Sequence, residues 1–248
     1  MAFGGVQIPR TLLCVNVSRV AALRTARGGK EPDPVEAARI CTKTGCNSIA
    51  VRLREDRRHI KDRDVVAIRK AIPENGKVYL EIALSRELID LARRVRPSRV
   101  TIVPEKNEDM TPNRGLDVRE NIREIGNAVG ILNKEDIPVS LFIEPDTELI
   151  DLSKECGARF VEINTSAYSR ATLRADIDRE IDRIYKASEH AAEIRIMINA
   201  GCGLNYTNVA PLVRSRELLE FNIGQAIVSR ADSVGLSTAV EEMMAILD

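Results

Sequence analysis

A strongly charged segment at residues 51–64, VRLREDRRHIKDRD, holds the groups best suited to bind an anion. It carries Arg52 and Arg54 as well as His59, one of only two histidines in the chain. Guanidinium groups bind phosphate and carboxylate through fixed sets of N–H donors, and imidazole changes its charge near neutral pH. Most runs of mixed charge are solvated surface. The segment therefore predicts a site only if other polar groups meet it.

Polar side chains also stand at the ends of other short apolar runs. If these runs are parallel strands of a barrel, their carboxyl ends gather at one edge, where the active sites of such barrels lie. A purely structural barrel does not need polar residues there, so the pattern favours a polar ligand site or an active site. The residues concerned are Asn16, Arg52, Arg54, Glu81, Glu105, Glu144, Glu162, Asn164, Asn199, Asn222 and Gln225.

Glycine-bearing turns after the last two runs predict a phosphate site. The strings NAGCG and NIGQ contain Gly201, Gly203 and Gly224. Glycine lets backbone N–H groups turn inward, and a following helix N-terminus adds positive potential. Taken alone the signal is weak, because glycine often only closes a turn. A second anion site, which suits two phosphorylated substrates or one bisphosphate, is predicted from four basic residues: Arg27, Arg52, Arg54 and His59.

The elements that must position these residues are eight apolar runs alternating with helical patterns. The runs lie at residues 12–17, 48–53, 77–83, 99–103, 138–143, 159–163, 194–198 and 218–223. They show little polar alternation, which is typical of parallel strands buried on both faces. Helices are predicted at 34–44, 62–71, 86–95, 116–133, 146–156 and 173–192, with a short helical stretch at 208–213 and two more short helices at the end.

This alternation over 248 residues predicts one (β/α)8 TIM barrel. A doubly wound open sheet is the competing architecture, but no GxGxxG follows the first run. Asp33, Asp62, Ser85 and Asp146 are the predicted helix N-caps. No linker divides the chain, so the expected domains are a loose N-terminal arm at 1–11 and a barrel at 12–248.

Composition excludes several classes of protein. The net charge is zero, aromatic residues make up 3% and tryptophan is absent, so a nucleic-acid partner is not expected. No apolar run is long enough to span a membrane, and no membrane partner is expected. The five cysteines are scattered and never spaced as CxxC, which argues against a zinc site or a disulfide framework. We therefore expect a cytoplasmic protein.

Several strings resemble the PdxJ family of pyridoxine 5′-phosphate synthases. The resemblance rests on VNVSRVAALRTARG, PDPVEAA, VRLREDRRHIKDRDV, LEIA, VPEK, GLDV, VSLFIEPD, VEINT, NAGCGLNY and NIGQAI, and it covers nearly the whole chain. It implies a (β/α)8 barrel that forms a homo-octamer. It also implies condensation of 3-amino-2-oxopropyl phosphate with 1-deoxy-D-xylulose 5-phosphate, which closes a pyridine ring with loss of water and phosphate.

The resemblance also implies roles for individual residues. Glu81 stands at a catalytic carboxylate, and Glu162 at the residue that stabilises the transition state. The other matching positions bind phosphate: Asn16, Arg27, Gly203 and Gly224 for the amino-ketone, and Arg54, His59 and Thr111 for the pentulose.

Five histidines of the family pattern are absent. Arg52 replaces a general base and Cys202 a proton donor, while the other three changes place Arg19 (in the pair Ser18-Arg19), Asn164 and Gln225. An arginine stays protonated and cannot act as a base, whereas a thiol can donate a proton. Arg52 and Cys202 thus remain candidate catalytic residues, although Cys202 could equally be a small filler. Ser18, Arg19 and Gln225 are candidate binding residues.

Three functions stay open from the sequence. The first is a PdxJ-like enzyme acting on phosphorylated keto and amino-keto substrates with altered chemistry, in which Glu81 is the base. The second is a non-catalytic paralogue that binds a phosphorylated ligand or serves as the partner subunit of a true synthase. The third is the family reaction in a rearranged site. No cofactor and no metal ion are expected, because the polar residues lack the spacing of metal ligands.

Overall fold

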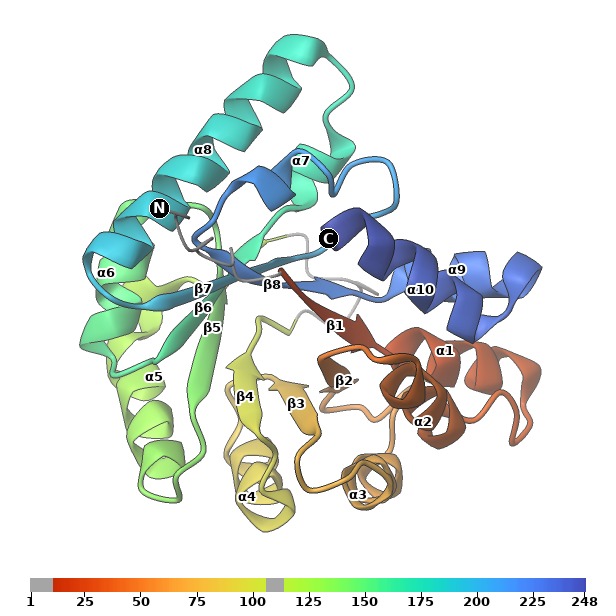
Figure 1. The fold of residues 1–248 in the computed structure, drawn as a ribbon. Coiled ribbons are helices and arrows are strands. Elements are labelled where there is room, and N and C mark those ends of the chain that lie inside the picture. The colour runs from red at the N-terminus through yellow and green to blue at the C-terminus, as the bar shows by residue number, and fades with distance from the viewer. Residues whose placement is uncertain (1–10, 106–113) are drawn as a thin grey trace, which may run out of the picture.

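Eight parallel strands close into a barrel in the order of the sequence, from β1 beside β2 round to β8 beside β1 (Figure 1). The computed structural model describes residues 11–105 and 114–248. The strands are β1 (Leu12–Asn16), β2 (Ser48–Leu53), β3 (Lys77–Ile82), β4 (Arg99–Ile102), β5 (Val139–Ile143), β6 (Phe160–Asn164), β7 (Met197–Gly201) and β8 (Leu218–Ile223). This confirms the predicted TIM barrel.

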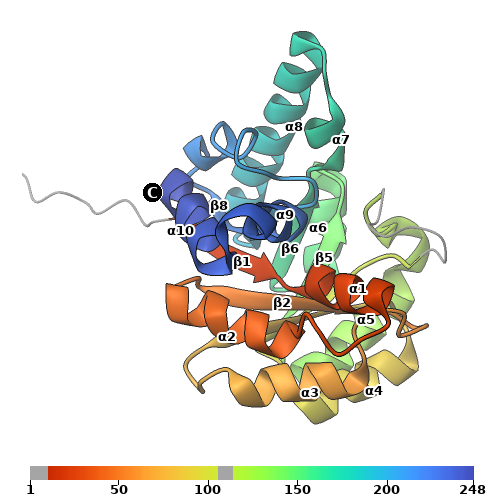
Figure 2. The same ribbon diagram turned by 90° about the vertical axis from the view of Figure 1, so that its right-hand side faces the viewer.

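Helices surround the barrel, and in both views α8 extends beyond the ring (Figures 1 and 2). They are α1 (Ser18–Arg27), α2 (Pro34–Thr44), α3 (Asp62–Ala71), α4 (Arg86–Val95), α5 (Val118–Asn133), α6 (Thr147–Glu155), α7 (Ser166–Arg170), α8 (Arg174–Glu193), α9 (Gln225–Val234) and α10 (Leu236–Leu247), with a short 3-10 helix η1 at Leu212–Arg214. No helix in the described ranges is long and apolar enough to cross a bilayer.

Local sequence signals set several of these boundaries. Asp33 accepts a hydrogen bond from the Val35 N–H (3.0 Å) at the start of α2, and Pro34 occupies the first helical position. Gly45 ends α2 with a left-handed φ of 106°, a conformation that glycine adopts without steric cost. Asp146 accepts hydrogen bonds from two N–H groups at the start of α6. The sequence thus fixes where these helices begin and end.

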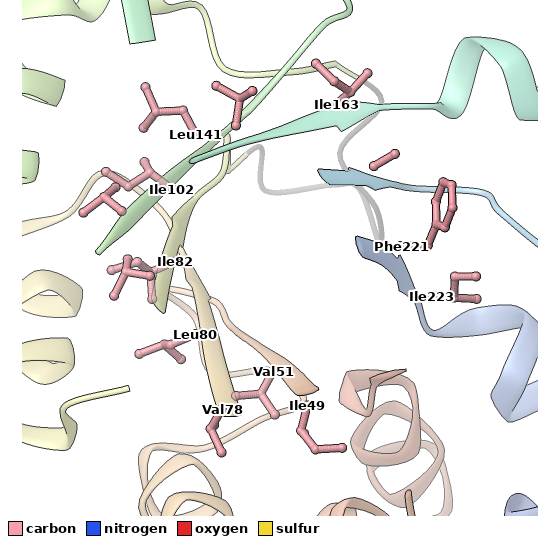
Figure 3. Packing of buried hydrophobic residues seen from close by; sticks show 14 of the residues in the cluster. Ile49, Val51, Val78, Leu80, Ile82, Ile102, Leu141, Ile163, Phe221 and Ile223 are labelled. Atoms are coloured by element: carbon pink, nitrogen blue, oxygen red, sulfur yellow. The ribbon is translucent and has the colours of Figure 1, made fainter. Parts of the chain in front are cut away.

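The apolar core lies between the strands and the helices rather than inside the barrel. Ile49, Val51, Leu80, Ile82 and Ile163 are among the fully buried strand residues of this layer (Figure 3). They alternate along each strand with residues of the opposite face, because successive side chains in a strand point to opposite sides. Burial of both faces confirms the prediction, but the inner face is polar.

A buried ion pair fills the inner face near the amino ends of the strands. Arg99 Nη2 lies 3.1 Å from Glu220 Oε2, and both side chains are 4% exposed. Glu220 Oε1 also accepts a hydrogen bond from Ser48 Oγ (2.5 Å), and the Arg99 guanidinium lies 3.7 Å from the centre of the Tyr79 ring. Asn199, with its amide oxygen turned toward Arg99, accepts two further hydrogen bonds. Each charge therefore depends on the other for compensation.

We expect Arg99→Met to destabilise the fold by about 3–5 kcal/mol, because Glu220 would remain buried without its counter-ion. Urea-induced unfolding monitored by circular dichroism measures the change. The double variant Arg99→Met with Glu220→Leu is the control, and it should recover most of the loss because no unpaired charge remains. A single variant as stable as the wild type would contradict the interpretation.

The structure corrects four sequence predictions. The two short helices α1 and α7 are absent from the prediction. Strand β7 begins three residues later than predicted, because Arg195 takes a left-handed φ of 61° and turns the chain before it. Lys61 rather than Asp62 is the N-cap of α3. The stretch predicted as helical at 208–213 contains only the beginning of the short 3-10 helix η1. The loose arm stays a prediction, since residues 1–10 lie outside the described chain.

Candidate active site

A cavity of about 510 Å³ opens at the carboxyl ends of the strands. Most of the residues predicted from the sequence meet there although they come from six different strands and the turns that follow them. Those that line it are Asn16, Ser18, Arg19, Arg52, Glu81, Glu162, Cys202, Gly203, Gly224 and Gln225. The prediction of one shared site at this end of the barrel therefore agrees with the geometry.

Glu81 of β3 and Glu162 of β6 are linked by one amide at the end of β8. Asn222 Nδ2 donates to Glu81 Oε1 (2.8 Å) and to Glu162 Oε1 (3.0 Å). Asn16 Nδ2 donates to the same Glu81 oxygen (2.7 Å). Both carboxyl groups are buried, at 8% and 4% exposure of the residue. Two amides thus hold Glu81 as an acceptor, and one of them reaches across to Glu162.

Burial makes the carboxyl group of Glu162 a weaker acid than an exposed glutamate. It raises the pKa of Glu162 from 4.5 to about 8, and the nearby charge of Glu81 raises it further in the same direction. Two carboxylates so close cannot both ionise easily. At neutral pH Glu162 therefore holds a proton, and Glu81 accepts hydrogen bonds from two amides.

Folding stability should depend on the charge of Glu162. Its pKa is raised in the folded state, so the neutral group contributes stability that is fully present below about pH 4.5 and is lost as pH rises through about 8. Between pH 6 and pH 9 the wild type should lose more stability than Glu162→Gln, whose side chain stays neutral. Urea unfolding at both pH values measures the difference. Glu124→Gln, at an exposed position, is the control.

Glycines leave room for the groups of the site. A Cβ at Gly201 would lie 2.5 Å from Glu162 Oε1, and one at Gly224 would lie 2.7 Å from the Asn16 carbonyl oxygen. Gly203 has a φ of 80°, and a Cβ there would collide with the Ser169 side chain. Gly224 is also the N-cap of α9, so the free N–H groups of the first turn border the cavity. The arrangement suits a phosphate group.

Cys202 lies between these glycines in a strained turn. Its φ is 82°, which non-glycine residues rarely adopt, and Thr165 Oγ1 holds the turn by donating to the carbonyl groups of Gly201 and Cys202 (2.8 and 2.7 Å). Burial, followed by the charge of Glu162, raises the pKa of the thiol to about 11. The thiol is therefore protonated at neutral pH and can serve as a donor, not as a nucleophile.

The Cys202 thiol should react slowly with iodoacetamide. At pH 7.5 a pKa of about 11 leaves roughly two orders of magnitude less thiolate than a free cysteine has. Mass spectrometry of timed labelling, with Cys202→Ser to identify the modified site, measures the rate. Labelling of Cys202 as fast as that of a short cysteine peptide would show that the thiolate is present.

Other predicted residues lie outside this cavity lining. Arg54 is buried, with its Nε 3.7 Å from Glu105 Oε1. Both ring nitrogens of His59 are buried and have no hydrogen-bond partner among the described residues, and burial and the charges of Arg58, Arg19 and Arg54 lower its pKa. Arg27 lies exposed in the last turn of α1. Thr111 falls outside the described residues. The second anion site thus stays a prediction.

Some lining residues are missing from the sequence prediction. Ser166, Ser169 and Arg170 belong to α7, a five-residue helix whose sequence SAYSR has no apolar periodicity. The sequence identifies Asn222 as a polar residue near the end of a predicted strand. The residues around it in the sequence do not indicate that it donates hydrogen bonds to two carboxyl groups. Asn164, which the resemblance places at a family histidine, does not line the cavity, and its Nδ2 donates to Glu144 Oε1 (2.8 Å). Among the described residues, no group of three His, Cys, Asp or Glu could hold a metal ion.

Comparison with known proteins decides the family. A family model described as "Pyridoxal phosphate biosynthesis protein PdxJ" matches residues 13–248. The chain belongs to the PdxJ family. It is 44% identical over 232 residues to the pyridoxine 5′-phosphate synthase of Pseudoalteromonas translucida (strain TAC 125), an alignment that covers 94% of this chain and 95% of that protein. The corresponding protein of Synechococcus sp. (strain JA-2-3B'a(2-13)) is 45% identical over 93% of this chain and 96% of its own length.

Two solved structures share the barrel fold but have a much lower sequence identity to this chain. Thiamine phosphate pyrophosphorylase from Pyrococcus furiosus has a TM-score of 0.62 at 16% identity, covering 96% of this chain and 95% of its own. Phosphoribosyl anthranilate isomerase from Thermus thermophilus has a TM-score of 0.62 at 12% identity, covering 96% and 98%. These matches support the barrel fold alone. The family model and the sequence relatives confirm the PdxJ resemblance drawn from the motifs, while the roles of individual residues stay predictions.

Proposed function

We propose that this chain is an enzyme that condenses a phosphorylated amino-ketone with a phosphorylated ketone, as pyridoxine 5′-phosphate synthases do, and that it moves protons with carboxyl groups in place of histidines. The observation that carries the proposal is the pair Glu81 and Glu162 joined through Asn222 inside the cavity. Relatives more than 40% identical over nearly the whole chain are named pyridoxine 5′-phosphate synthases, which supports the reaction class.

The proton-transfer roles follow from the environment of each carboxyl group. Glu81 Oε1 is occupied by two amide donors, which leaves its other oxygen to take a proton from the substrate. Glu162 is neutral at pH 7 because its pKa is about 8, so it can give a proton to a departing hydroxyl group. Ring closure needs both kinds of step, since amine addition to a ketone and loss of water each move a proton.

Phosphate binding is assigned to the turn after β7 and the start of α9. Gly203 and Gly224 bring backbone N–H groups close to the cavity, and the α9 N-terminus adds positive potential. Arg54, His59 and Thr111 are proposed to bind the phosphate of the second substrate. The unpartnered ring nitrogens of His59 support this role, because a phosphate oxygen would supply the acceptor that the ring N–H group lacks among the described residues.

A second candidate is a non-catalytic protein that binds phosphorylated ligands or serves as a partner subunit of a true synthase. One observation favours it: no histidine is among the residues of the described chain that line the cavity. Arg52 cannot accept a proton at working pH. This candidate therefore predicts binding without turnover.

One assay separates the two candidates. Purified protein is mixed with 3-amino-2-oxopropyl phosphate and 1-deoxy-D-xylulose 5-phosphate, and pyridoxine 5′-phosphate is measured by chromatography and mass. We expect product to form. Calorimetric binding of either substrate without product would support the ligand-binding candidate. Absence of both would contradict the enzyme and the ligand-binding protein, and co-purification with a synthase tests the role of partner subunit.

The wider assignments remain part of the proposal. We infer from the family resemblance that the chain acts as a homo-octamer in the cytoplasm and requires no cofactor. The five cysteines, all within the described residues, form no disulfide, which fits a reducing compartment. Size-exclusion chromatography with light scattering tests the assembly.

A further inference from the structure

The side chain of Asn222 uses one amide nitrogen to hold two carboxyl groups from strands that are not neighbours. Nδ2 donates to Glu81 Oε1 on β3 (2.8 Å) and to Glu162 Oε1 on β6 (3.0 Å). An amide nitrogen carries two protons, so both of its donors are used. Asn222 itself lies on β8, in register with Gly201 of β7, and lines the cavity. The amide therefore sets the distance between two groups that no shared strand pairing brings together.

The surroundings of Asn222 favour this contact over simple packing. A Cβ at Gly201 would lie 2.5 Å from Glu162 Oε1 and 3.2 Å from the Cβ of Asn222, so a larger residue there would force the pair apart. Asn222 Oδ1, by contrast, is buried without a hydrogen-bond partner among the described residues. A buried acceptor without a donor costs stability, and a leucine of similar shape would avoid that cost. The two donated hydrogen bonds thus explain the asparagine better than packing does.

The same hydrogen bonds determine which oxygen of each carboxyl group can exchange a proton. Both bonds from Asn222, and the bond from Asn16 Nδ2 to Glu81 (2.7 Å), end on Oε1. A proton on Oε1 would compete with these donors. Oε2 is therefore the oxygen that gains a proton in Glu81 and the oxygen that carries one in neutral Glu162.

We propose that Asn222 is a positioning residue for proton transfer: it joins the Glu81 and Glu162 carboxyl groups through Oε1 and leaves Oε2 of each to exchange a proton with the substrate. Asn222 itself exchanges no proton. The inference rests on the reaction proposed above, and it assigns a role to a residue that the motif-based roles do not include.

Loss of the amide should change the acidity of Glu162. Burial and then the charge of Glu81 raise its pKa to about 8, and the hydrogen bond from Asn222 acts against both because it favours the charged form. The other charged or titratable groups around Glu162 stay in place when Asn222 is replaced, namely Arg99, Glu220 and Cys202. Asn222→Leu should therefore raise the pKa of Glu162, and the pH above which activity falls should rise with it.

Two measurements on Asn222→Leu test the inference. Product formation from the phosphorylated amino-ketone and ketone gives kcat and KM as a function of pH. Infrared difference spectroscopy of the protonated carboxyl group gives the pKa of Glu162 without any need for activity, and Glu162→Gln identifies the band. We expect kcat to fall about 10–100-fold with KM changed by less than about threefold. The alkaline limb of the activity profile and the infrared titration should move upward together by about half a pH unit or more.

Two further variants separate positioning from general destabilisation. Asn164→Leu removes the corresponding amide from Glu144, a carboxyl group at the same end of the barrel that does not line the cavity, and it should leave the pKa of Glu162 unchanged. Asn222→Asp keeps the shape of the side chain but can donate at most one hydrogen bond. It should also lower kcat at least tenfold and raise the pKa of Glu162, which gives a second test if Asn222→Leu does not fold.

Each outcome decides between the proposals. An unchanged pKa of Glu162 in Asn222→Leu, or an equal shift in Asn164→Leu, overturns the role of Asn222, and product formed by the wild type would leave the proposed reaction standing. If the wild type forms no product, the proposed reaction fails. The infrared titration then decides the positioning alone: a raised pKa in Asn222→Leu supports it, and an unchanged pKa overturns it.

Discussion

Glu81→Gln is expected to lower turnover by about 10²–10⁴, the range typical for loss of one proton-transfer group. The change is close to isosteric. A glutamine oxygen can still accept the hydrogen bonds that Asn16 and Asn222 donate to Glu81 Oε1, so the local geometry should survive. What the variant loses is the ability to take a proton. Steady-state measurement of product formation should show a fall in kcat with little change in KM.

The matched control for this variant is Glu144→Gln. Glu144 is also held by two donors at the same end of the barrel, the Gly115 N–H (2.7 Å) and Asn164 Nδ2 (2.8 Å), but it does not line the cavity. Its substitution should cost less than tenfold in turnover. Equal losses in both variants would show that any carboxylate at this edge matters structurally. Unchanged turnover in Glu81→Gln would remove Glu81 from the proposed chemistry.

The assignment of base and acid also predicts how the remaining activity responds to pH. Because the pKa of Glu162 is raised to about 8, its proton is present below that pH and lost above it. A reaction that needs Glu162 as an acid should therefore slow as pH rises through about 8. The argument depends on burial and on the neighbouring carboxylate, both of which arise only when β3 and β6 meet in the closed barrel.

Local sequence patterns were sufficient to predict the barrel. Apolar runs of strand length and helix caps such as Asp33 act over a few residues, so they can be read without tertiary information. The bounds of α2, α3 and β8 agree with the prediction for that reason. Helix α7 was missed because it has only five residues, and α1 because Val17 at its N-cap provides no capping side chain that marks its start.

Contacts between distant residues could not be predicted in the same way. Arg99 and Glu220 are 121 residues apart, and Asn222 joins carboxylates 141 and 60 residues away. Each of these residues looks like an isolated polar residue in an apolar run. Their pairing depends on which inner-face positions share one level of the barrel, and this follows from strand register rather than from local sequence. The sequence therefore predicted which end of the barrel is functional, but not how its groups are linked.

The second large effect is expected from restoring histidines at two positions. Arg52→His combined with Cys202→His should raise turnover of the two phosphorylated substrates by at least about 100-fold over the wild type, because two groups with pKa values near 6.5 would replace one that cannot accept a proton and one that rarely loses its own. Both positions line the same cavity, so the new side chains would face one bound substrate.

The backbone should accept both changes. Histidine adopts the left-handed conformation of Cys202 more readily than most non-glycine residues, and replacing Arg52 removes a half-buried guanidinium whose Nε has no hydrogen-bond partner among the described residues. Each single variant is measured beside the double variant under identical conditions. A gain confined to the double variant would indicate that the scaffold still binds and orients both substrates and lacks only fast proton transfer. A wild type already as fast as the double variant would show instead that the carboxyl pair is sufficient, because histidines then add nothing to the rate.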